Sequence, residues 1–594
     1  MRLLILLALL APAQVPAVSA ATVCAQFCDT LDPSRARQEI FPVPEVNLNG
    51  RRLVLHVSDT DGMAWGSIDN GTTGNAVWLD RSWDGGATWD GLLGRASIPS
   101  TWTGTRTLMY NVADPVNHRR GIVRACGDAG GVACTQWVYP SVCDGGVCDR
   151  AAASGAAGDV QPVPETTLRG RRIALHVDSR GLAWGTLTNG VAGDEVWLDR
   201  SWDEGASWPG GSSLGRTTTG RTALFQTRDP RSLLYGGAVR ACGKGVDGND
   251  GSCTAWARPP LDRANAAADA LLYAYRADTA WWPSSWWNTA ATLTTVIDWQ
   301  RRAGRSDLRW LVERTFDVNK GTFPAGIKSS DPIEGNFISR AIDDAAWWGI
   351  AWVAAFDLTG ERRYLDMAAT IATYVHGFWD TGTCGGGVWW NRERTYKNAV
   401  TVGLYIRLTA ALHNRLPGDS TWLSRANAGW RWFDGSGLIN GAGLVNDGLT
   451  GGCANNGQTV WTYNQGLAIG GALELYRASG DPNLLARARR LADAALASTV
   501  LTRNGVLTES CDPAGTCDDN QKQFKGVFMR YLDDLADTTG DARYRAYART
   551  QADTLWAADR DPLNRIGLRW SGGSATNPRD WRTQATGLAA LLAV

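Results

Sequence analysis

Apolar and polar residues follow two different patterns along this chain of 594 residues. Up to about residue 260 they alternate in short runs broken by Gly and Asn, which is typical of β-strands and hairpins. After Pro259-Pro260 the apolar positions recur at helical spacing in long alanine-rich stretches, beginning with residues 264–277. We therefore expect an all-β part, then an all-α part, with the boundary near residue 260.

The β-rich part is a tandem duplication. The segment at residues 51–57, Arg-Arg-Leu-Val-Leu-His-Val, recurs at residues 171–177 as Arg-Arg-Ile-Ala-Leu-His-Val, an offset of 171 − 51 = 120 residues. The match continues through the Trp-Leu-Asp-Arg-Ser-Trp-Asp runs that begin at Trp78 and Trp197. The sequence thus predicts two small β-modules, at residues 21–140 and 141–260, before a helical domain at residues 261–594.

The first twenty residues have the layout of a cleaved secretory signal, with Arg2, an apolar stretch at residues 3–13 and Val18-Ser19-Ala20 at its end. The protein is therefore expected to be secreted and extracellular. No later apolar stretch reaches the roughly 18 residues of a membrane span, so none is expected.

In an oxidising compartment the twelve cysteines are expected to form disulfides. Each β-module contains four of them and should pair them internally, with three connectivities open in each copy. These cysteines are Cys24, Cys28, Cys126 and Cys134 in the first copy, and Cys143, Cys148, Cys242 and Cys253 in the second.

Composition narrows the possible partners. The 59 basic residues balance 59 acidic ones, which argues against a nucleic-acid partner held by phosphate neutralisation. The 30 Trp outnumber the 14 Tyr and 11 Phe combined, and such rings can stack on sugars or fill cores. Five scattered histidines offer no zinc ligand set, and no cofactor or metal is expected, although a Ca²⁺ site need not have a recognisable spacing. Nothing indicates the oligomeric state.

One motif occurs in both β-modules. Ser82-Trp83-Asp84-Gly85-Gly86-Ala87-Thr88-Trp89 and its counterpart at residues 201–208 resemble the Asp-box of sialidases. In those proteins Asp and Gly secure a hairpin turn, and the Trp packs beneath it. We therefore expect these Trp residues to pack in the hairpin core, with a sugar-binding face as the alternative.

Glycines divide the helical part into periods of about 60 residues. Gly304, Gly360, Gly418, Gly480 and Gly540 are each expected to end a helix. Two helices fit into each period, and six such hairpins can close into an (α/α)6 barrel; an open superhelix is the alternative. The twelve expected helices lie near residues 263–277, 285–303, 307–318, 338–358, 362–379, 394–414, 419–433, 459–478, 483–500, 521–537, 541–558 and 580–594.

Loops of roughly 15 to 25 residues precede the even-numbered helices, whereas about two residues follow them, so the long loops share one end of the barrel. The helix starts at that end carry carboxylate, amide, amine and aromatic groups, a mixture that suits a polyhydroxylated ligand. Any single Asn or Asp there could instead cap its helix. The segments are Trp286–Asn288, Asp343–Trp348, Tyr396–Ala399, Trp461–Gly466, Gln523–Gly526 and Asp580–Gln584.

Asp343 and Asp344 supply the two carboxyl groups that hydrolysis of a glycosidic bond needs. Neighbours in sequence can lie within the ~5–5.5 Å of a retaining enzyme, and their repulsion would keep one protonated near neutral pH. The other Asp-Asp pairs, at residues 518–519 and 533–534, are expected to lie on the solvated surface.

With these motifs the chain resembles the endo-α-1,6-mannanases of glycoside hydrolase family 76 over roughly residues 262–594. The likeness rests on Asp343-Asp344, Gly386–Trp390, Tyr396–Ala399, Trp461–Gly466 and Phe524–Gly526. It implies an (α/α)6 barrel and a retaining reaction with Asp343 as nucleophile and Asp344 as acid/base. The implied substrate is the α-1,6-mannan backbone of fungal cell walls or of mycobacterial-type glycans.

The same motifs supply the candidate sugar contacts, although the Trp pair among them could equally pack its own loop. These candidates are Trp389, Trp390, Tyr396, Lys397, Asn398, Tyr463, Asn464, Gln465, Phe524 and Lys525. In the long loops Cys384 is expected to pair with Cys453, by elimination, and Cys511 with Cys517.

Two other functions stay open. A mannan transglycosylase would use the same Asp pair and lengthen its products, and a non-catalytic glycan-binding protein would use the Trp-rich modules alone. The β-modules fall outside the resemblance and are expected to be accessory modules that could hold the enzyme on its polymer.

Overall fold

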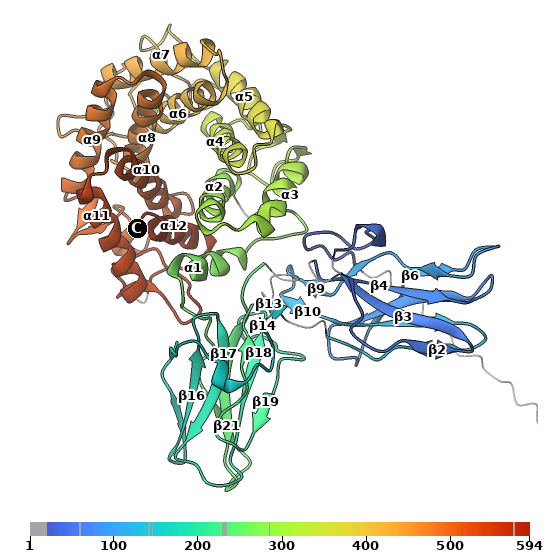
Figure 1. Ribbon diagram of the computed structural model, residues 1–594. Coiled ribbons are helices and arrows are strands. Elements are labelled where there is room, and N and C mark those ends of the chain that lie inside the picture. Colours follow the sequence, from blue (N-terminus) through green and yellow to red (C-terminus); the bar gives the residue numbers. More distant parts are fainter. Residues whose placement is uncertain are drawn as a thin grey trace, which may run out of the picture. The chain divides into compact units, whose positions relative to one another are not determined.

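The computed structural model describes residues 21–37, 39–58, 61–139, 143–144, 147–228, 234–283, 285–573 and 576–594, with backbone only at 143–144 and 147–148. The expected signal segment lies outside these described residues. The chain divides into two compact units, one up to Asp114 together with Arg119–Ser141, the other comprising Pro115–His118 and Val142–Val594. The second unit contains the second β-module and the helical domain (Figure 1).

The first β-module consists mainly of two antiparallel sheets whose inner faces share one core. Leu53 and Leu55 from one sheet pack in that core with Val77, Leu79 and Ala125 from the other. The first sheet contains β1 (Glu39–Ile40), β2 (Val46–Leu48), β3 (Arg51–Ser58), β4 (Met63–Asp69), β7 (Thr105–Arg106) and β8 (Tyr110–Asn111). The second has the order β12 (Val132–Cys134), β11 (Ile122–Asp128), β5 (Ala76–Ser82) and β6 (Asp90–Ser97).

The second β-module repeats this arrangement, so the duplicated sequence is also a duplicated fold. Asp80 faces Arg124 across β5 and β11, and Asp199 faces Arg240 at the equivalent place. Its first sheet has the order β15 (Thr166–Leu168), β16 (Arg171–Val177), β17 (Leu182–Thr188) and β20 (Phe225–Gln226). Its second has the order β19 (Leu214–Thr217), β18 (Glu195–Ser201), β21 (Ala238–Lys244) and β22 (Gly251–Cys253).

The motif shared by the modules forms a hydrogen-bonded turn. The N–H of Gly86 donates to Ser82 Oγ at 2.8 Å, and the N–H of Thr88 donates to Asp84 Oδ1 at 2.9 Å. Trp202 is buried, but Trp89 at the end of the first motif is 51% exposed. The expectation that these Trp residues pack in the hairpin core is therefore wrong for Trp89, because its ring lies on the solvent side of the sheet.

Disulfides follow the predicted distribution wherever their side chains are described. Within the modules Cys24 pairs with Cys28, Cys126 with Cys134 and Cys242 with Cys253. Cys143 and Cys148 are register partners in the hairpin of β13 (Cys143–Asp144) and β14 (Val147–Cys148), but their side chains lie outside the described part. In the helical domain the expected pairs Cys384–Cys453 and Cys511–Cys517 are confirmed.

Twelve α-helices lie in the described part of the helical domain, each at its predicted place with ends that differ by up to five residues. They are α1 (Arg263–Leu272), α2 (Trp286–Ala303), α3 (Arg309–Asn319), α4 (Ile342–Thr359), α5 (Arg362–His376), α6 (Ala399–Arg415), α7 (Thr421–Gly435), α8 (Thr462–Ser479), α9 (Pro482–Ala497), α10 (Phe524–Thr539), α11 (Ala542–Thr554) and α12 (Trp581–Leu592).

The even-numbered helices form an inner ring, and the odd-numbered ones lie outside it (Figure 1). Each inner helix packs against the next, and α12 packs against α2. The burial patterns explain this sorting. The inner helix α8 is buried around most of its circumference, whereas the outer helix α9 buries only the stripe of Leu484, Ala488, Leu491, Ala492 and Ala495. The helical domain is therefore an all-α, barrel-like fold.

Of the five glycines that were expected to end a helix, four do so, and the helices that they end belong to the inner ring. Gly304, Gly360, Gly480 and Gly540 adopt the left-handed conformation, with φ between 63° and 74°. The expectation for Gly418 is wrong, because α6 already ends at Arg415 and the next residue is extended. That residue precedes Pro417, and proline disfavours a helical conformation in the residue before it.

Candidate functional site

A pocket of about 720 Å³ lies at the end of the ring where α2, α4, α6, α8 and α10 begin. Five different helix starts or the loops before them contribute to it, which agrees with the site expected at the long-loop end. The chemically distinctive side chains of its wall are Trp286, Trp287, Asp331, Arg340, Asp343, Asp344, Trp347, Trp390, Tyr396, Asn398, Asp447, Tyr463, Asn520 and Phe524.

Asp343 and Asp344 lie in the first turn of α4. The backbone at Trp390 anchors this helix start, because the N–H of Ile342 donates to the Trp390 carbonyl at 2.7 Å. Burial raises the pKa of Asp343 to about 7, while a hydrogen bond from the Trp390 side chain opposes the rise. Burial and the charge of Asp343 raise the pKa of Asp344 well above its ordinary value. An ionised Asp343 therefore opposes the ionisation of Asp344.

Besides Asp343 and Asp344, the pocket wall contains two aspartates that the sequence did not reveal, Asp331 and Asp447. The hydroxyl of Tyr396 donates to Asp447 Oδ2 at 2.6 Å, and the side-chain amide of Asn456 donates to the same hydroxyl at 2.7 Å. Burial raises the pKa of Asp447, and the charge of Asp447 in turn raises that of Asp343. Because Asp447 lies in an irregular loop between α7 and α8, no local pattern could have singled it out.

Stacked aromatic rings form another part of the pocket wall. Tyr463 and Phe524 are parallel, with ring centroids 3.9 Å apart and planes 3° from each other. Trp287 stacks on Trp347 at 5.3 Å and donates its indole N–H to Asn520 Oδ1 at 2.7 Å. Flat apolar faces beside carboxylates can take up both the C–H face and the hydroxyl groups of a sugar.

Five predicted sugar contacts lie in the pocket wall and five do not. Trp390, Tyr396, Asn398, Tyr463 and Phe524 are in the wall. Asn398 also caps α6, because its side chain accepts from the N–H of Thr401. The structure places the remaining five outside the wall, where their contacts are structural: Trp389, Lys397, Asn464, Gln465 and Lys525.

Lys397 stabilises the loop before α6 through hydrogen bonds to backbone carbonyls of that loop. Its buried ammonium donates to the carbonyls of Asp380, Thr383 and Gly386 at 2.8, 2.5 and 2.6 Å. The ring of Trp389 lies 4.7 Å from the same nitrogen. These contacts hold the segment that ends in Trp390, so Lys397 and Trp389 act on the pocket through that neighbour and not by touching a ligand.

Gln465 has a similar role for the loop that carries Asp447. Its side chain accepts from the N–H of Val445 and donates to the carbonyl of the same residue, both at 2.8 Å. Asn464 is buried beside it in α8, and its amide finds no hydrogen-bond partner among the described residues.

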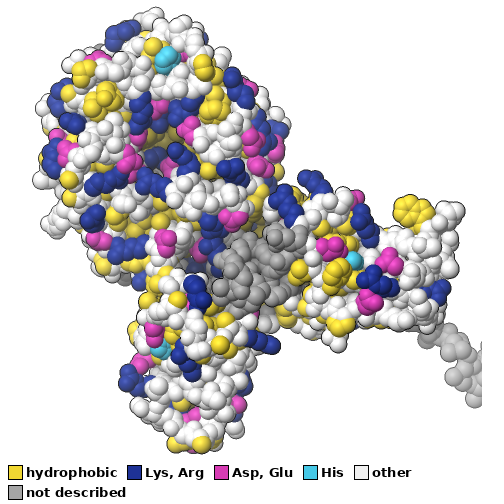
Figure 2. Space-filling model, in the orientation of Figure 1, with side chains coloured by type: hydrophobic (Ala, Val, Ile, Leu, Met, Phe, Trp, Pro, Cys, Tyr) yellow, Lys and Arg dark blue, Asp and Glu magenta, His cyan; other side chains and the backbone are white. Residues whose placement is uncertain are grey.

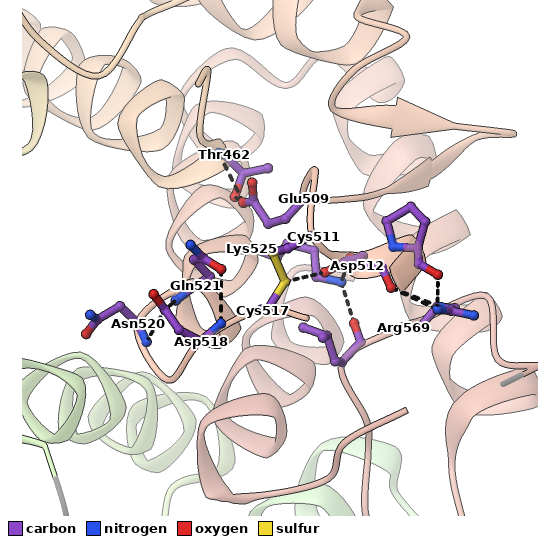
Figure 3. The surroundings of a disulfide bond; sticks show 12 residues. Thr462, Glu509, Cys511, Asp512, Cys517, Asp518, Asn520, Gln521, Lys525 and Arg569 are labelled. Carbon is purple, nitrogen blue, oxygen red and sulfur yellow. Dashed lines mark hydrogen bonds and ion pairs between the residues drawn. A yellow bond between two sulfur atoms is a disulfide. The ribbon is translucent and has the colours of Figure 1, made fainter. Parts of the chain in front are cut away.

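Lys525 lies in the first turn of α10 and contacts a loop that is held by a disulfide (Figure 3). Its ammonium donates to Asp512 Oδ2 and to the Leu568 carbonyl, both at 2.6 Å, and Asp512 lies between the paired Cys511 and Cys517. Glu509 in the same loop accepts from the N–H of Thr462 at 3.1 Å, at the start of α8.

Burial raises the pKa of Glu509 to about 8. The loop thus fixes the start of α8, just before Tyr463, from one side. On its other side the loop leads to Asn520, which contacts Trp287.

Charges of both signs are mixed over the visible face of the helical domain (Figure 2), in agreement with a net charge of zero.

Among the described residues, the groups of Asp and Cys close enough to hold a metal each combine one aspartate with two disulfide-bonded cysteines, which are not available as thiolate ligands. None of the described helices combines the length and apolar character needed to cross a bilayer.

Two neighbouring carboxyl groups beside stacked aromatic rings are the kind of groups that hydrolysis of a glycosidic bond requires. Residues 262–594 match the family model described as Glycosyl hydrolase family 76. The chain therefore belongs to glycoside hydrolase family 76.

Curated relatives in yeasts match part of the chain. Mannan endo-1,6-alpha-mannosidase DFG5 of Candida albicans is 26% identical over 319 residues, which cover 50% of this chain and 69% of that protein. DCW1 of the same species, another mannan endo-1,6-alpha-mannosidase, is 29% identical over 269 residues, 42% of this chain and 58% of that one. The DCW1 enzyme of Saccharomyces cerevisiae is 29% identical over 252 residues, 39% and 55% of the two chains. The chain thus spans 55 to 69% of the length of these relatives.

Solved structures show lower sequence identity. The GH76A alpha-1,6-mannanase from Salegentibacter sp. HEL1_6 is 23% identical with a TM-score of 0.47, covering 56% of this chain and 97% of that one. The Lin0763 protein from Listeria innocua is 24% identical with a TM-score of 0.48, covering 56% and 95%.

Proposed function

We propose that this protein is a secreted, retaining endo-α-1,6-mannanase that cleaves the mannan backbone of fungal or mycobacterial-type cell-wall glycans. The pair Asp343 and Asp344 carries the proposal, because two adjacent carboxyl groups with raised pKa values lie in one aromatic pocket. Family membership supports glycosidase chemistry, and the names of the yeast relatives support the α-1,6-mannan linkage.

The two carboxyl groups divide the reaction between them. Asp344 gives its proton to the departing glycosidic oxygen while the ionised Asp343 attacks the anomeric carbon, which forms a mannosyl-enzyme and releases one end of the chain. Asp344, now ionised, then takes a proton from a water molecule. That water attacks the anomeric carbon, displaces Asp343 and releases a mannose end of the original configuration.

The pocket wall provides the proposed substrate contacts. Tyr463 and Phe524 present ring faces, and Trp390, Tyr396 and Asn398 add hydrogen-bonding groups next to the Asp pair. Asp447 joins this set as an acceptor for sugar hydroxyls, because it lines the same pocket.

We assign residues 261–594 to an (α/α)6 barrel, and residues 21–140 and 141–260 to accessory β-modules. The barrel assignment is supported by the inner ring of even-numbered helices, in which α12 packs against α2. Secretion is supported by the disulfides, because the described cysteine side chains are all paired.

Product analysis on linear α-1,6-mannan tests the proposal. Wild type should release short manno-oligosaccharides whose new reducing ends are first formed as the α-anomer, measured by NMR during the first minutes. Asp343→Asn should release none. Ends first formed as the β-anomer would overturn the retaining mechanism, lengthened products would identify a transglycosylase, and binding without turnover by wild type would make the protein a glycan-binding protein.

A further inference from the structure

The solvent face of the second sheet in each β-module carries an aromatic cluster. In the first module the guanidinium of Arg124 lies 5.2 Å from the ring centroid of Trp89 and 4.4 Å from that of Trp137. The two rings are 6.2 Å apart and inclined at 62°, so the guanidinium fills the angle between them. Since Trp89 is 51% exposed, one large indole surface faces solvent.

The second module contains the same cluster. Arg240 lies 4.6 Å from the ring centroids of both Trp208 and Trp256, and these rings are 5.5 Å apart at 53°. One aspartate holds the arginine in each copy. Nε and Nη2 of Arg124 donate to Asp80 Oδ2 at 2.9 and 2.8 Å, and those of Arg240 donate to Asp199 Oδ2 at 3.0 and 2.9 Å.

These rings do not belong to the hydrophobic core that the two sheets of each module share. The shared core lies on the other face of the sheet, where Val77 and Leu79 alternate along β5 with the outward Trp78 and Asp80. None of the cluster residues belongs to the described core of either module. An antiparallel sheet with one solvated face ordinarily carries polar side chains there, so a pair of tryptophans on that face is unusual.

Comparison of the two copies separates this cluster from other exposed apolar side chains. Phe41 is 58% exposed, but the second copy has Gln161 at its place. Trp102 is 65% exposed and lies in the segment between Arg95 and Arg106, which is six residues shorter in the second copy. The Trp–Arg–Trp cluster and its aspartate are present in both copies.

The turn beneath each cluster is shaped to receive an indole ring. Gly86 and Gly205 have φ of 97° and 96°, a conformation that side-chain-bearing residues rarely adopt. A Cβ at Gly205 would lie 2.5 Å from the Trp256 ring, and one at Gly86 would lie 3.5 Å from Trp137 Nε1. The hydrogen bonds of Ser82 and Asp84 fix the first turn, so the exposed ring at its end is presented on a rigid support.

We infer that the clusters Trp89–Arg124–Trp137 and Trp208–Arg240–Trp256 are binding sites for a neutral polysaccharide chain. An indole face takes up the C–H face of a pyranose ring, and the remaining guanidinium N–H groups can donate to sugar hydroxyls. Asp80 and Asp199 neutralise the arginines, so the clusters have no net charge with which to attract an acidic polymer. Two such sites on one chain strengthen retention on a repeating polymer by raising the effective concentration.

Affinity electrophoresis of the full-length chain through gels containing linear α-1,6-mannan tests this inference. All variants carry Asp343→Asn so that the polymer stays intact, and excess α-1,6-mannotetraose occupies the barrel pocket. Trp89→Ala with Trp208→Ala should weaken retention at least tenfold, with each single change intermediate. Trp102→Ala is the matched control, an exposed Trp outside the cluster, and should leave retention unchanged.

Retention of the double variant equal to that of its parent would overturn the inference. Retention of the parent in gels of an acidic polysaccharide, but not in gels of neutral mannan, β-glucan or cellulose derivatives, would also overturn it. If the alanine pair fails to fold by circular dichroism, Trp89→Tyr with Trp208→Tyr, which keeps a smaller ring, is measured by the same criterion.

A second measurement distinguishes this site from the catalytic one. With Asp343 intact, the double variant should hydrolyse a short α-1,6-manno-oligosaccharide as fast as wild type while losing rate on dilute polymer. If the oligosaccharide is hydrolysed but the clusters do not bind the polymer, the inference about the clusters fails and the proposed activity stands. If the clusters bind the polymer but no oligosaccharide is hydrolysed, the proposed activity fails and the inference about the clusters stands.

Discussion

Tyr463 and Phe524 stack in parallel with 3.9 Å between their ring centroids, although they begin two different inner helices, α8 and α10. Their helices pack side by side, so the stack forms where the two starts meet at the pocket. An aromatic platform is thereby placed in the wall of the pocket that also contains Asp343 and Asp344.

Phe524→Leu tests the platform, because leucine keeps most of the buried volume but removes the ring face. We expect KM for α-1,6-mannotetraose to rise about tenfold, since an aromatic stack is worth about 0.5–1.5 kcal/mol beyond its buried area. Steady-state kinetics measure this. Phe433→Leu, at a buried position of the outer helix α7, is the control for a general loss of packing and should leave KM unchanged.

The pH profile of kcat/KM should be bell-shaped. Asp343 must be ionised to attack and has a pKa of about 7, so activity should rise with pH through that region. In the proposed mechanism Asp344 must be protonated, and its pKa is raised well above the ordinary value, so activity should fall again once Asp344 ionises. Because the charge of Asp447 raises the pKa of Asp343, Asp447→Asn should move the acid limb to lower pH. An acid limb that stays in place would contradict this coupling.

The same carboxyl groups should make the folded state less stable as pH rises. Their folded pKa values exceed the unfolded value of about 4, so the folded state holds more protons between that pH and about 7, and the free energy of unfolding falls across this window. Asparagine cannot ionise. Asp343→Asn should therefore raise Tm at pH 8 by about 2 °C or more and leave it unchanged at pH 4, measured by scanning calorimetry. A higher Tm at pH 4 only would refute the assignment.

Lys397→Met should destabilise the protein even though Lys397 does not line the pocket. The change leaves three buried carbonyls without a donor, which should lower the free energy of unfolding by about 3 kcal/mol in urea titrations. The loosened loop ends at Trp390, so kcat should fall as well. Lys320→Met, on an exposed lysine paired with Asp317, should change stability by less than about 0.5 kcal/mol. Equal effects of the two changes would contradict the structural role of Lys397.

The Cys511–Cys517 disulfide should affect substrate binding as well as stability. The loop that it closes holds Glu509 at the start of α8 and leads to Asn520 beside Trp287. Replacing both cysteines by serine should lower the free energy of unfolding by about 2 kcal/mol and raise KM several-fold. The matching change at Cys242 and Cys253, in the second β-module, should lower stability without altering KM for an oligosaccharide.

Regular elements and local pairings could be predicted from the sequence. The twelve helices and the duplicated strands follow from short-range periodicity, because backbone hydrogen bonds and one-sided burial act over neighbouring residues. The Asp343–Asp344 pair could be placed at a helix start for the same reason. Gly418 is the exception, since Pro417 ended its helix earlier than the glycine pattern suggested.

Only the tertiary structure decided which polar side chains reach the pocket. Lys397 and Lys525 lie next to wall residues in sequence, yet both turn inward because loops distant along the chain offer carbonyl and carboxylate acceptors. Asp447 and Asn520 reach the pocket from irregular loops, with Tyr396 and Trp287 as their distant partners. The sequence by itself thus determined the elements and the position of Asp343 and Asp344 at a helix start. Long-range packing of the loops determined the rest of the site, because a loop side chain takes its direction from whichever partner the fold brings to it.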